Sequence, residues 1–187
     1  ISGLYNDMKI NSVEIAQISQ YAENVFFKKP CGLMDQMACS VGGMVNIDFK
    51  DPTKPIVKKV PTEFEKYDYS LCIVDTKGDH VDLTDDYAMI PSEMKKVANF
   101  LGEDYLRDCD SNEFYIRLDE IREAVGDRPV LRAIHFFNEE YNVKNAVSSL
   151  ENGKFVEFLD AIRKSGNSSF KYLQNVYLSL IHISEPT

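Results

Sequence analysis

The hydrophobic pattern of the first third of the chain predicts helices before strands. Apolar residues three or four positions apart predict a helix over residues 12–25 with one buried stripe. Asn11 and Glu14 have the spacing of a capping box, so we expect the helix to begin at Ser12. The stripe consists of Ile15, Ile18, Ala22 and Val25.

A shorter apolar run predicts a second helix from about Leu33 to Gly42. Pro30 stops the preceding segment, because it cannot donate a backbone hydrogen bond. We expect Gly32 to let the backbone turn without a Cβ clash. The two helices should therefore be joined by a tight turn that leads directly into the second helix.

Alternation of polar and apolar residues follows this helix. Residues 44–49 and 56–60 have the pattern of strands, and Asp51-Pro52 between them is typical of a turn, which predicts an antiparallel pair. Residues 69–75 contain the run Leu71-Cys72-Ile73-Val74, which is typical of a strand buried on both faces.

The rest of the chain has helical periodicity interrupted by glycines. Pro91 falls in the first turns of the first helix, where a missing N–H is tolerated. The predicted helices cover residues 87–101, 111–125, 129–150 and 154–165, a last one begins near Ser168, and the breaks lie at Gly102, Gly126, Gly153 and Gly166. Two apolar faces are predicted: Leu131, Ile134, Phe137 and Tyr141, and Phe155, Phe158, Leu159 and Ile162.

Composition narrows the class of protein. The chain has 187 residues, of which 44% are hydrophobic, enough for one large domain or parts of two. Its net charge of −9 argues against nucleic acids and anionic membranes as partners. The four cysteines form no C-x-x-C pair, which argues against zinc and suits a reducing cytoplasm. No stretch approaches the roughly 20 apolar residues of a membrane span.

Both ends of the chain have unusual sequences. There is no initiator Met and no signal-peptide pattern, so we expect the chain to begin inside a longer protein. Residues 178–187 resemble the translation of a transposase adapter used in sequencing libraries. We therefore expect a non-native tail after Tyr177, and His182 enters no functional argument.

Asp35 is the main candidate for chemistry. It falls in the first turn of the second predicted helix, among Leu33, Met34 and Met37. The positive end of the helix dipole favours a charged carboxylate there. Such a residue is either a helix cap or a working acid or base.

Two histidines have simpler explanations. His80 stands among the aspartates of residues 79–86, but the spacing fits no calcium loop and favours a solvated acidic loop, so we assign no metal site. His135 lies beside Phe136 and Phe137 on a long helix, which is typical of a core residue. Walker, dinucleotide-binding and G-x-S-x-G motifs are absent from the sequence.

The segment around Asp35 also resembles a known family. Cys31-Gly32-Leu33-Met34-Asp35-Gln36, preceded by Ala22-Glu23-Asn24 and Phe27, is similar to the catalytic-aspartate segment of galactokinases, which are GHMP kinases. Asp75, His80 and Tyr87 keep the family spacing between a buried strand and a sugar-contacting tyrosine, and Arg132, His135 and Glu139 resemble a supporting helix of the family.

Two departures from the family pattern indicate a divergent branch. Lys28 stands where galactokinases frequently have glycine. Ala88-Met89-Ile90-Pro91 stands where an Asn and paired arginines are common. The sugar is therefore less firmly implied than the class of kinase.

The resemblance implies an α+β fold with the two domains of a GHMP kinase. Residues 1–62 would complete the N-terminal domain, and residues 63–177 would form most of the C-terminal one. The family's N-terminal sugar-binding motif, phosphate loop and C-terminal glycine-rich motif have no counterpart in the sequence. No residue of this chain is therefore assigned to the nucleotide.

The implied reaction is phosphorylation of the anomeric C1 hydroxyl of galactose by ATP with Mg²⁺, in the cytoplasm. Asp35 would take or orient the proton of that hydroxyl, while backbone at Gly32 and the phenol of Tyr87 would hold the sugar. Two alternatives remain: a related sugar-1-kinase acting on galacturonate or arabinose, and a non-catalytic sugar-sensing paralogue. The partners are thus a small sugar and ATP, with no nucleic acid and no membrane.

Overall fold

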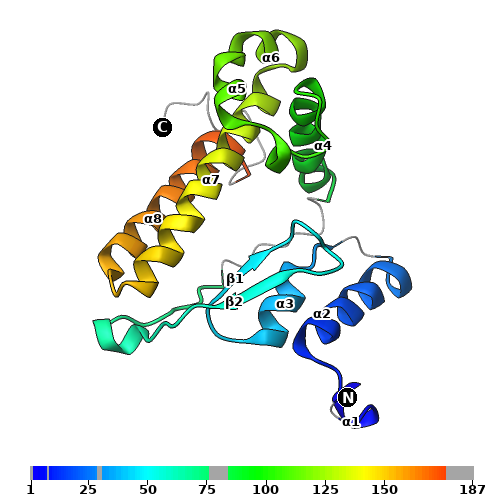
Figure 1. Cartoon of the computed structure of the whole chain (residues 1–187), viewed down its shortest axis with the longest axis vertical. Helices are drawn as coiled ribbons and strands as arrows, with labels where there is room; N and C mark the ends of the chain where they lie inside the picture. The colour runs from blue at the N-terminus through cyan, green and yellow to red at the C-terminus, as the bar shows by residue number, and fades with distance from the viewer. Residues whose placement is uncertain (1, 8, 29–30, 76–83, 176–187) are drawn as a thin grey trace. The chain divides into compact units, whose positions relative to one another are not determined.

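The computed structural model describes residues 2–7, 9–28, 31–75 and 84–175, without the side chains of residues 2, 3 and 84–87. The chain divides into two compact units, Ile1–Ser70 and Leu71–Thr187 (Figure 1). The described part is mostly helical with one two-stranded sheet, which is compatible with the expected α+β class. The assignment of residues 1–62 and 63–177 to the two domains of a kinase stays a prediction, and the expected tail lies outside the described residues.

The first unit begins with two helices and a widened turn. Its elements are α1 (Ser2–Tyr5), α2 (Ser12–Tyr21), the π-helical turn η1 (Ala22–Phe26) and α3 (Met34–Val41), followed by β1 (Val45–Asp48), β2 (Ile56–Lys59) and the 3₁₀ turn η2 (Phe64–Tyr67). The capping box is confirmed, because Glu14 N–H donates to Asn11 Oδ1 at 3.0 Å and Asn11 N–H donates to Glu14 Oε2 at 2.9 Å. Gly42 ends α3 with φ 70°, as expected of a helix-terminating glycine.

The stripe predicted for α2 is wrong in part. Ala16 is fully buried and Val13 packs beside it, whereas Ile18 and Val25 are 47% and 48% exposed. The prediction assumed 3.6 residues per turn up to residue 25. The π-helical turn at Ala22 breaks that period before Val25. Ile18 precedes this turn and lies on the opposite side of α2 from buried Ala16.

The antiparallel pair is confirmed. Val45 lies opposite Lys59 and Asp48 lies opposite Ile56, and Val60 N–H extends the ladder by donating to Met44 O at 2.9 Å. In Figure 1 the two strands lie beside α3. A small core joins these elements: buried Ala16, Leu33 and Met37, with Val13, Val41, Ile47, Phe49 and Val57 packed against them.

The strand predicted over residues 69–75 is wrong. These residues have no regular secondary structure, and Leu71, Ile73 and Val74 are 81%, 95% and 79% exposed. A strand buried on both faces needs neighbouring strands and covering layers. Among the described residues, the sheet contains only β1 and β2.

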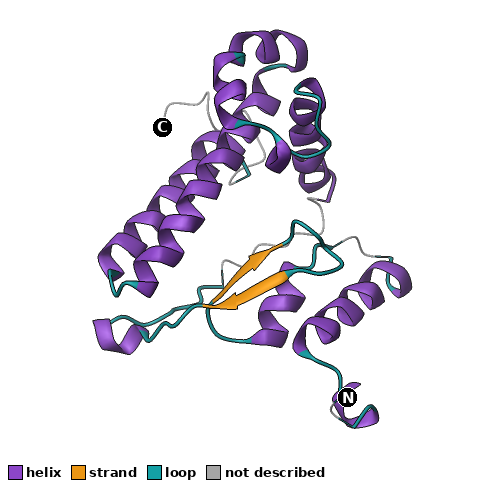
Figure 2. Ribbon diagram, in the orientation of Figure 1, coloured by secondary structure: helices purple, strands orange, loops and turns teal. Residues whose placement is uncertain are grey.

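The second unit consists of helices and loops in its described part (Figure 2). Its elements are α4 (Thr84–Phe100), the 3₁₀ turn η4 (Leu106–Asp108), α5 (Ser111–Ile116), α6 (Leu118–Val125), α7 (Asp127–Glu151), α8 (Phe155–Ser168) and the π-helical turn η5 (Ser169–Leu173). The core is formed by Val97, Ala98, Leu106, Phe114, Ile121, Val130 and Ala133. Figure 1 shows α7 and α8 side by side as a hairpin.

Three predicted helix boundaries in this unit are wrong. The helix expected over residues 111–125 is interrupted at Arg117, whose side chain pairs with Glu113 on α5 and Glu120 on α6. Helix α4 begins before residue 87, so Pro91 lies inside it. Helix α8 continues through Gly166, because a glycine without positive φ does not by itself end a helix.

The two predicted apolar faces are shorter than expected. Phe155 and Phe158 are buried, but Ile162 and Tyr141 are exposed. On α8 the next buried residue is Ala161 and not Ile162. On α7 some buried positions hold polar side chains: Arg132, His135, Asn142 and Ser149. Hydrogen bonds from this polar set, described below, take the place of some of the expected apolar contacts.

Candidate functional site

Asp35 is the second residue of α3, and its side chain is exposed. The N-cap of α3 is Leu33, which makes no side-chain cap. Within the described part of the chain, the Asp35 carboxylate forms no hydrogen bond or ion pair. Among the described residues, no hydrogen bond therefore supports the interpretation of Asp35 as a helix cap. The carboxylate is exposed to solvent at the positive end of the helix dipole.

The helix that carries Asp35 is anchored on its opposite side. Leu33 and Met37 are buried in the small core of the first unit. Ser40 Oγ donates to Ser12 O at 2.7 Å, which ties the far end of α3 to the start of α2. The backbone that carries the exposed Asp35 carboxylate is therefore held in place.

Gly32 lies exposed in the turn before α3. A Cβ built at this position would meet no atom within 4 Å, and the φ of Gly32 lies outside the left-handed region. The expected steric reason for this glycine is therefore wrong. The open space around it instead leaves its backbone accessible to a ligand.

Lys28 has the backbone conformation that glycine adopts easily. Its φ is 52°, in the left-handed region that is unfavourable for a lysine. Glycine, which the resemblance implies at this position, would adopt this conformation without strain.

Tyr87 belongs to α4, in the second unit, and its side chain lies outside the described part of the structure. Its predicted contact with the sugar, and its closeness to Asp35, stay predictions. His80 and residues 79–83 also lie outside the described residues. In the remaining chain, no three His, Cys, Asp or Glu side chains are grouped so as to hold a metal ion.

His135 is a buried core residue, as its apolar neighbours indicated. Its Nδ1 lies 3.0 Å from Ser168 Oγ, which joins α7 to α8. Burial lowers the pKa of His135, and the nearby Glu139 carboxylate opposes that shift. Glu139 in turn accepts hydrogen bonds from Ser165 Oγ at 2.6 Å and Asn142 Nδ2 at 2.9 Å.

A second group of charges braces α7 against α4. Glu93 is buried and accepts a hydrogen bond from Arg128 Nε at 2.9 Å. Arg132 Nη1, also buried, lies 2.8 Å from Glu93 Oε2. The Arg, His and Glu pattern of α7 therefore supports the helical packing.

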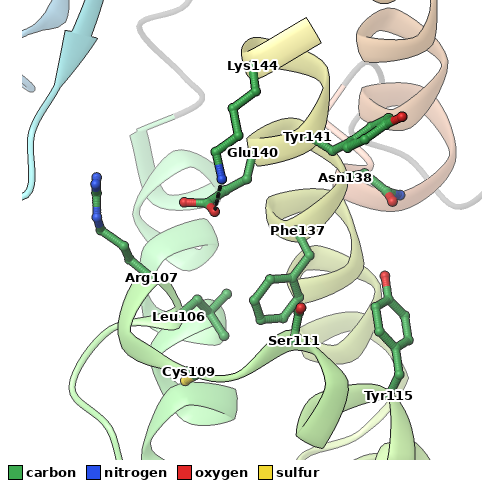
Figure 3. Close-up of a pocket in the computed structure, with 10 residues that line it drawn as sticks. All are labelled: Leu106, Arg107, Cys109, Ser111, Tyr115, Phe137, Asn138, Glu140, Tyr141 and Lys144. Carbon is green, nitrogen blue, oxygen red and sulfur yellow. Dashed lines mark hydrogen bonds and ion pairs between the residues drawn. The ribbon is translucent and has the colours of Figure 1, made fainter.

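The structure also contains a hollow that sequence reasoning missed. It measures about 340 Å³ and opens between η4, α5 and α7 (Figure 3). Aromatic side chains of Tyr115, Phe137 and Tyr141 line it together with polar groups, among them Lys144, whose Nζ lies 3.5 Å from Glu140 Oε2. These residues come from three elements, so no local motif could reveal the hollow.

Comparison with known proteins finds relatives for most of the chain. The chain is 29% identical to a galactokinase of Streptomyces coelicolor over 163 residues, which cover 84% of this chain and 40% of the relative. It is 30% identical to a galactokinase of Actinobacillus pleuropneumoniae over 151 residues, which cover 81% of this chain and 38% of the relative. The resemblance to galactokinases is confirmed.

The extent of the match is also informative. A galactokinase of Actinobacillus succinogenes is 28% identical over 171 residues, covering 90% of this chain and 43% of that relative. The chain thus spans about two fifths of the length of the curated galactokinases it matches. No protein-family model matches it. None of the described helices combines the length and apolar character needed to cross a membrane.

Proposed function

We propose that this chain is a section of a galactokinase-like sugar kinase, with a GHMP-type two-domain fold, in which Asp35 is the catalytic carboxylate. The single observation that carries the proposal is the exposure of the Asp35 carboxylate on an anchored helix. This carboxylate has no partner among the described residues and stands within the galactokinase-like segment. The similarity of most of the chain to galactokinases supports the same assignment.

The proposed reaction transfers the γ-phosphoryl group of ATP to the anomeric C1 hydroxyl of galactose and yields galactose 1-phosphate. Asp35 accepts or orients the proton of that hydroxyl as the oxygen attacks. Backbone at Gly32 and the phenol of Tyr87 hold the sugar. Such transfer depends mainly on positioning and charge stabilisation, with little covalent work by the protein.

ATP and Mg²⁺ contribute the phosphoryl group and charge neutralisation. The sequence contains no phosphate-loop motif, and the described residues contain no cluster that fits a metal. We therefore assign no residue of this chain to either group. We place the enzyme in the cytoplasm, where ATP is available and reduced thiols such as that of Cys39 persist.

One observation favours a second substrate. Lys28 adds an exposed cation to the turn before α3, where galactokinases frequently have glycine. A cation there suits the carboxylate of galacturonate. A panel of galactose, galacturonate and arabinose distinguishes these sugar-1-kinases, and binding of sugar and ATP without turnover by the full-length protein would indicate a sensing paralogue.

The test of the proposed function is Asp35→Asn in the full-length protein. We expect turnover to fall by about 10²–10⁴-fold, the usual contribution of a general base. The melting temperature should stay close to that of the unmodified protein, because the carboxylate has no described partner to lose. Coupled measurement of ADP release and differential scanning calorimetry check the two expectations.

Asp119→Asn is the matched control. Asp119 is also exposed and is also the second residue of an eight-residue helix without a side-chain cap, namely α6. The control removes the same helix-dipole interaction but should leave turnover unchanged. Near-normal phosphorylation by Asp35→Asn would refute the role of Asp35.

A further inference from the structure

The turn that leads into α3 is held by side chains of the preceding helical segment. Cys31 N–H donates to Asn24 Oδ1 at 2.8 Å, and Asn24 Nδ2 donates to Cys31 O at 3.3 Å. Gln20 Nε2 donates to the same carbonyl oxygen at 3.2 Å. Both backbone polar groups of Cys31 are therefore bound by side chains.

A second tie lies on the other side of Asp35. Gln36 Nε2 donates to Glu23 Oε1 at 3.0 Å. Glu23 and Asn24 are consecutive in η1, so neighbouring residues of one π-helical turn hold the chain before and after Asp35. Such turns occur frequently at functional sites.

We propose that Asn24 is a positioning residue for the sugar-kinase reaction. It fixes the Cys31 backbone and thereby sets the Gly32 backbone and the Asp35 carboxylate relative to each other. This inference rests on the proposed function, and Asn24 acts in it through Cys31 without touching the substrate. Precise placement matters because a shift of about 1 Å at a reacting group can cost about 10²-fold in rate.

Gln17 offers a matched control for the loss of hydrogen bonds between a side chain and a loop backbone. Its Nε2 donates to Thr53 O at 3.0 Å and lies 3.3 Å from Pro52 O, in the turn between β1 and β2. Gln17→Ala therefore also removes two contacts between a helical side chain and a loop backbone. The affected turn carries none of the proposed site residues.

The experiment compares both variants in the full-length protein. We expect Asn24→Ala to lower kcat by about 10- to 100-fold and to leave the KM for ATP unchanged, because no residue of this chain is assigned to the nucleotide. Gln17→Ala should keep the unmodified kcat while changing the melting temperature by a similar amount. Asn24→Asp keeps the acceptor for the Cys31 N–H and should recover part of kcat.

A readout that does not depend on activity is amide hydrogen exchange in the full-length protein. Hydrogen exchange at the Cys31 amide should become faster in Asn24→Ala and stay unchanged in Gln17→Ala, because Asn24 Oδ1 accepts that N–H whereas Gln17 contacts the turn between β1 and β2. Unchanged exchange in Asn24→Ala would overturn the inference, since the turn would then not depend on Asn24.

The kinetic outcomes separate this inference from the proposed function. Unmodified kcat in Asn24→Ala, in an enzyme that Asp35→Asn inactivates, would overturn the role of Asn24 and leave the proposed function standing. An equal loss of kcat in Asn24→Ala and Gln17→Ala would also overturn it, because stability alone would explain the effect. Failure of the unmodified full-length protein to phosphorylate any sugar would overturn both.

Discussion

Asp35 on α3 and Glu93 on α4 are both carboxylates on helices, and they differ in what surrounds them. Glu93 is buried and contacts Arg128 and Arg132. Asp35 is exposed and has no partner within the described residues. A buried charge requires compensating partners, and a carboxylate whose oxygens are occupied by these partners cannot bind a ligand as well. An exposed charge on an anchored helix keeps that ability, and this separates a bracing residue from a candidate for catalysis.

The largest expected change in stability comes from Glu93→Gln. Removing one partner of a buried ion pair leaves the other charge uncompensated, so we expect the free energy of unfolding to fall by about 3–5 kcal/mol. Urea denaturation followed by circular dichroism measures this loss. Glu140→Gln is the control, because its pair with Lys144 is exposed and should matter much less.

Asp35→Asn in the same denaturation series sharpens the comparison. We expect it to change the free energy of unfolding by less than about 0.5 kcal/mol, as is usual for an exposed residue without structural contacts. A loss as large as that of Glu93→Gln would mean that Asp35 is a structural residue, and the contrast between the two carboxylates would disappear.

The titration of His135 should make the free energy of unfolding depend on pH, with a smaller effect than that of Glu93→Gln. Burial lowers its pKa below the ordinary value of 6.5, so the folded state binds fewer protons at this site than the unfolded state. The contribution of His135 to the free energy of unfolding is therefore complete above about pH 6.5. It decreases as the pH falls below that value and through the lowered pKa of the folded state. Denaturation between pH 5 and pH 8 is the measurement.

His135→Gln removes the titrating group while keeping a side chain that can hydrogen-bond Ser168. We expect the variant to be less stable at neutral pH but to lose less further stability on acidification. An unchanged pH slope would contradict the assignment of that slope to His135.

The last expected effect is a small gain in stability at the turn near Asp35. Lys28 has φ 52°, and relieving a left-handed non-glycine conformation is worth about 1 kcal/mol. Lys28→Gly should therefore raise the free energy of unfolding by up to that amount. Lys9→Gly is the control at another exposed lysine without positive φ, and it should not stabilise the protein. Destabilisation by Lys28→Gly would indicate that the lysine side chain makes compensating contacts.

Local signals in the sequence predicted much of the first unit. The capping box at Asn11, the helix end at Gly42 and the hairpin between β1 and β2 depend on neighbouring residues, and all three are confirmed. Asp35 could be singled out because a first-turn position and a motif are both local features. The resemblance to galactokinases came from the same short segment.

Burial was the less predictable property. Leu71-Cys72-Ile73-Val74 has the composition of a buried strand, yet Leu71, Ile73 and Val74 are exposed, because composition does not supply the neighbours that a strand needs. Val25 was assigned to a buried stripe that the π-helical turn interrupts, and Ile18 lies on the side of α2 opposite buried Ala16. Polar side chains such as Asn142 are buried because Glu139, on the same helix, satisfies them.

By itself, the sequence determined where α2 begins, where α3 ends and which two strands pair, and it singled out Asp35 as the candidate for proton chemistry. Only the tertiary structure decided that Asn24 and Gln20 hold the Cys31 turn, that Glu93 is bound by two arginines and that a hollow forms beside Phe137. The physical reason is the range of the interactions. Caps and turns involve residues a few positions apart, whereas these contacts join residues that only folding brings together.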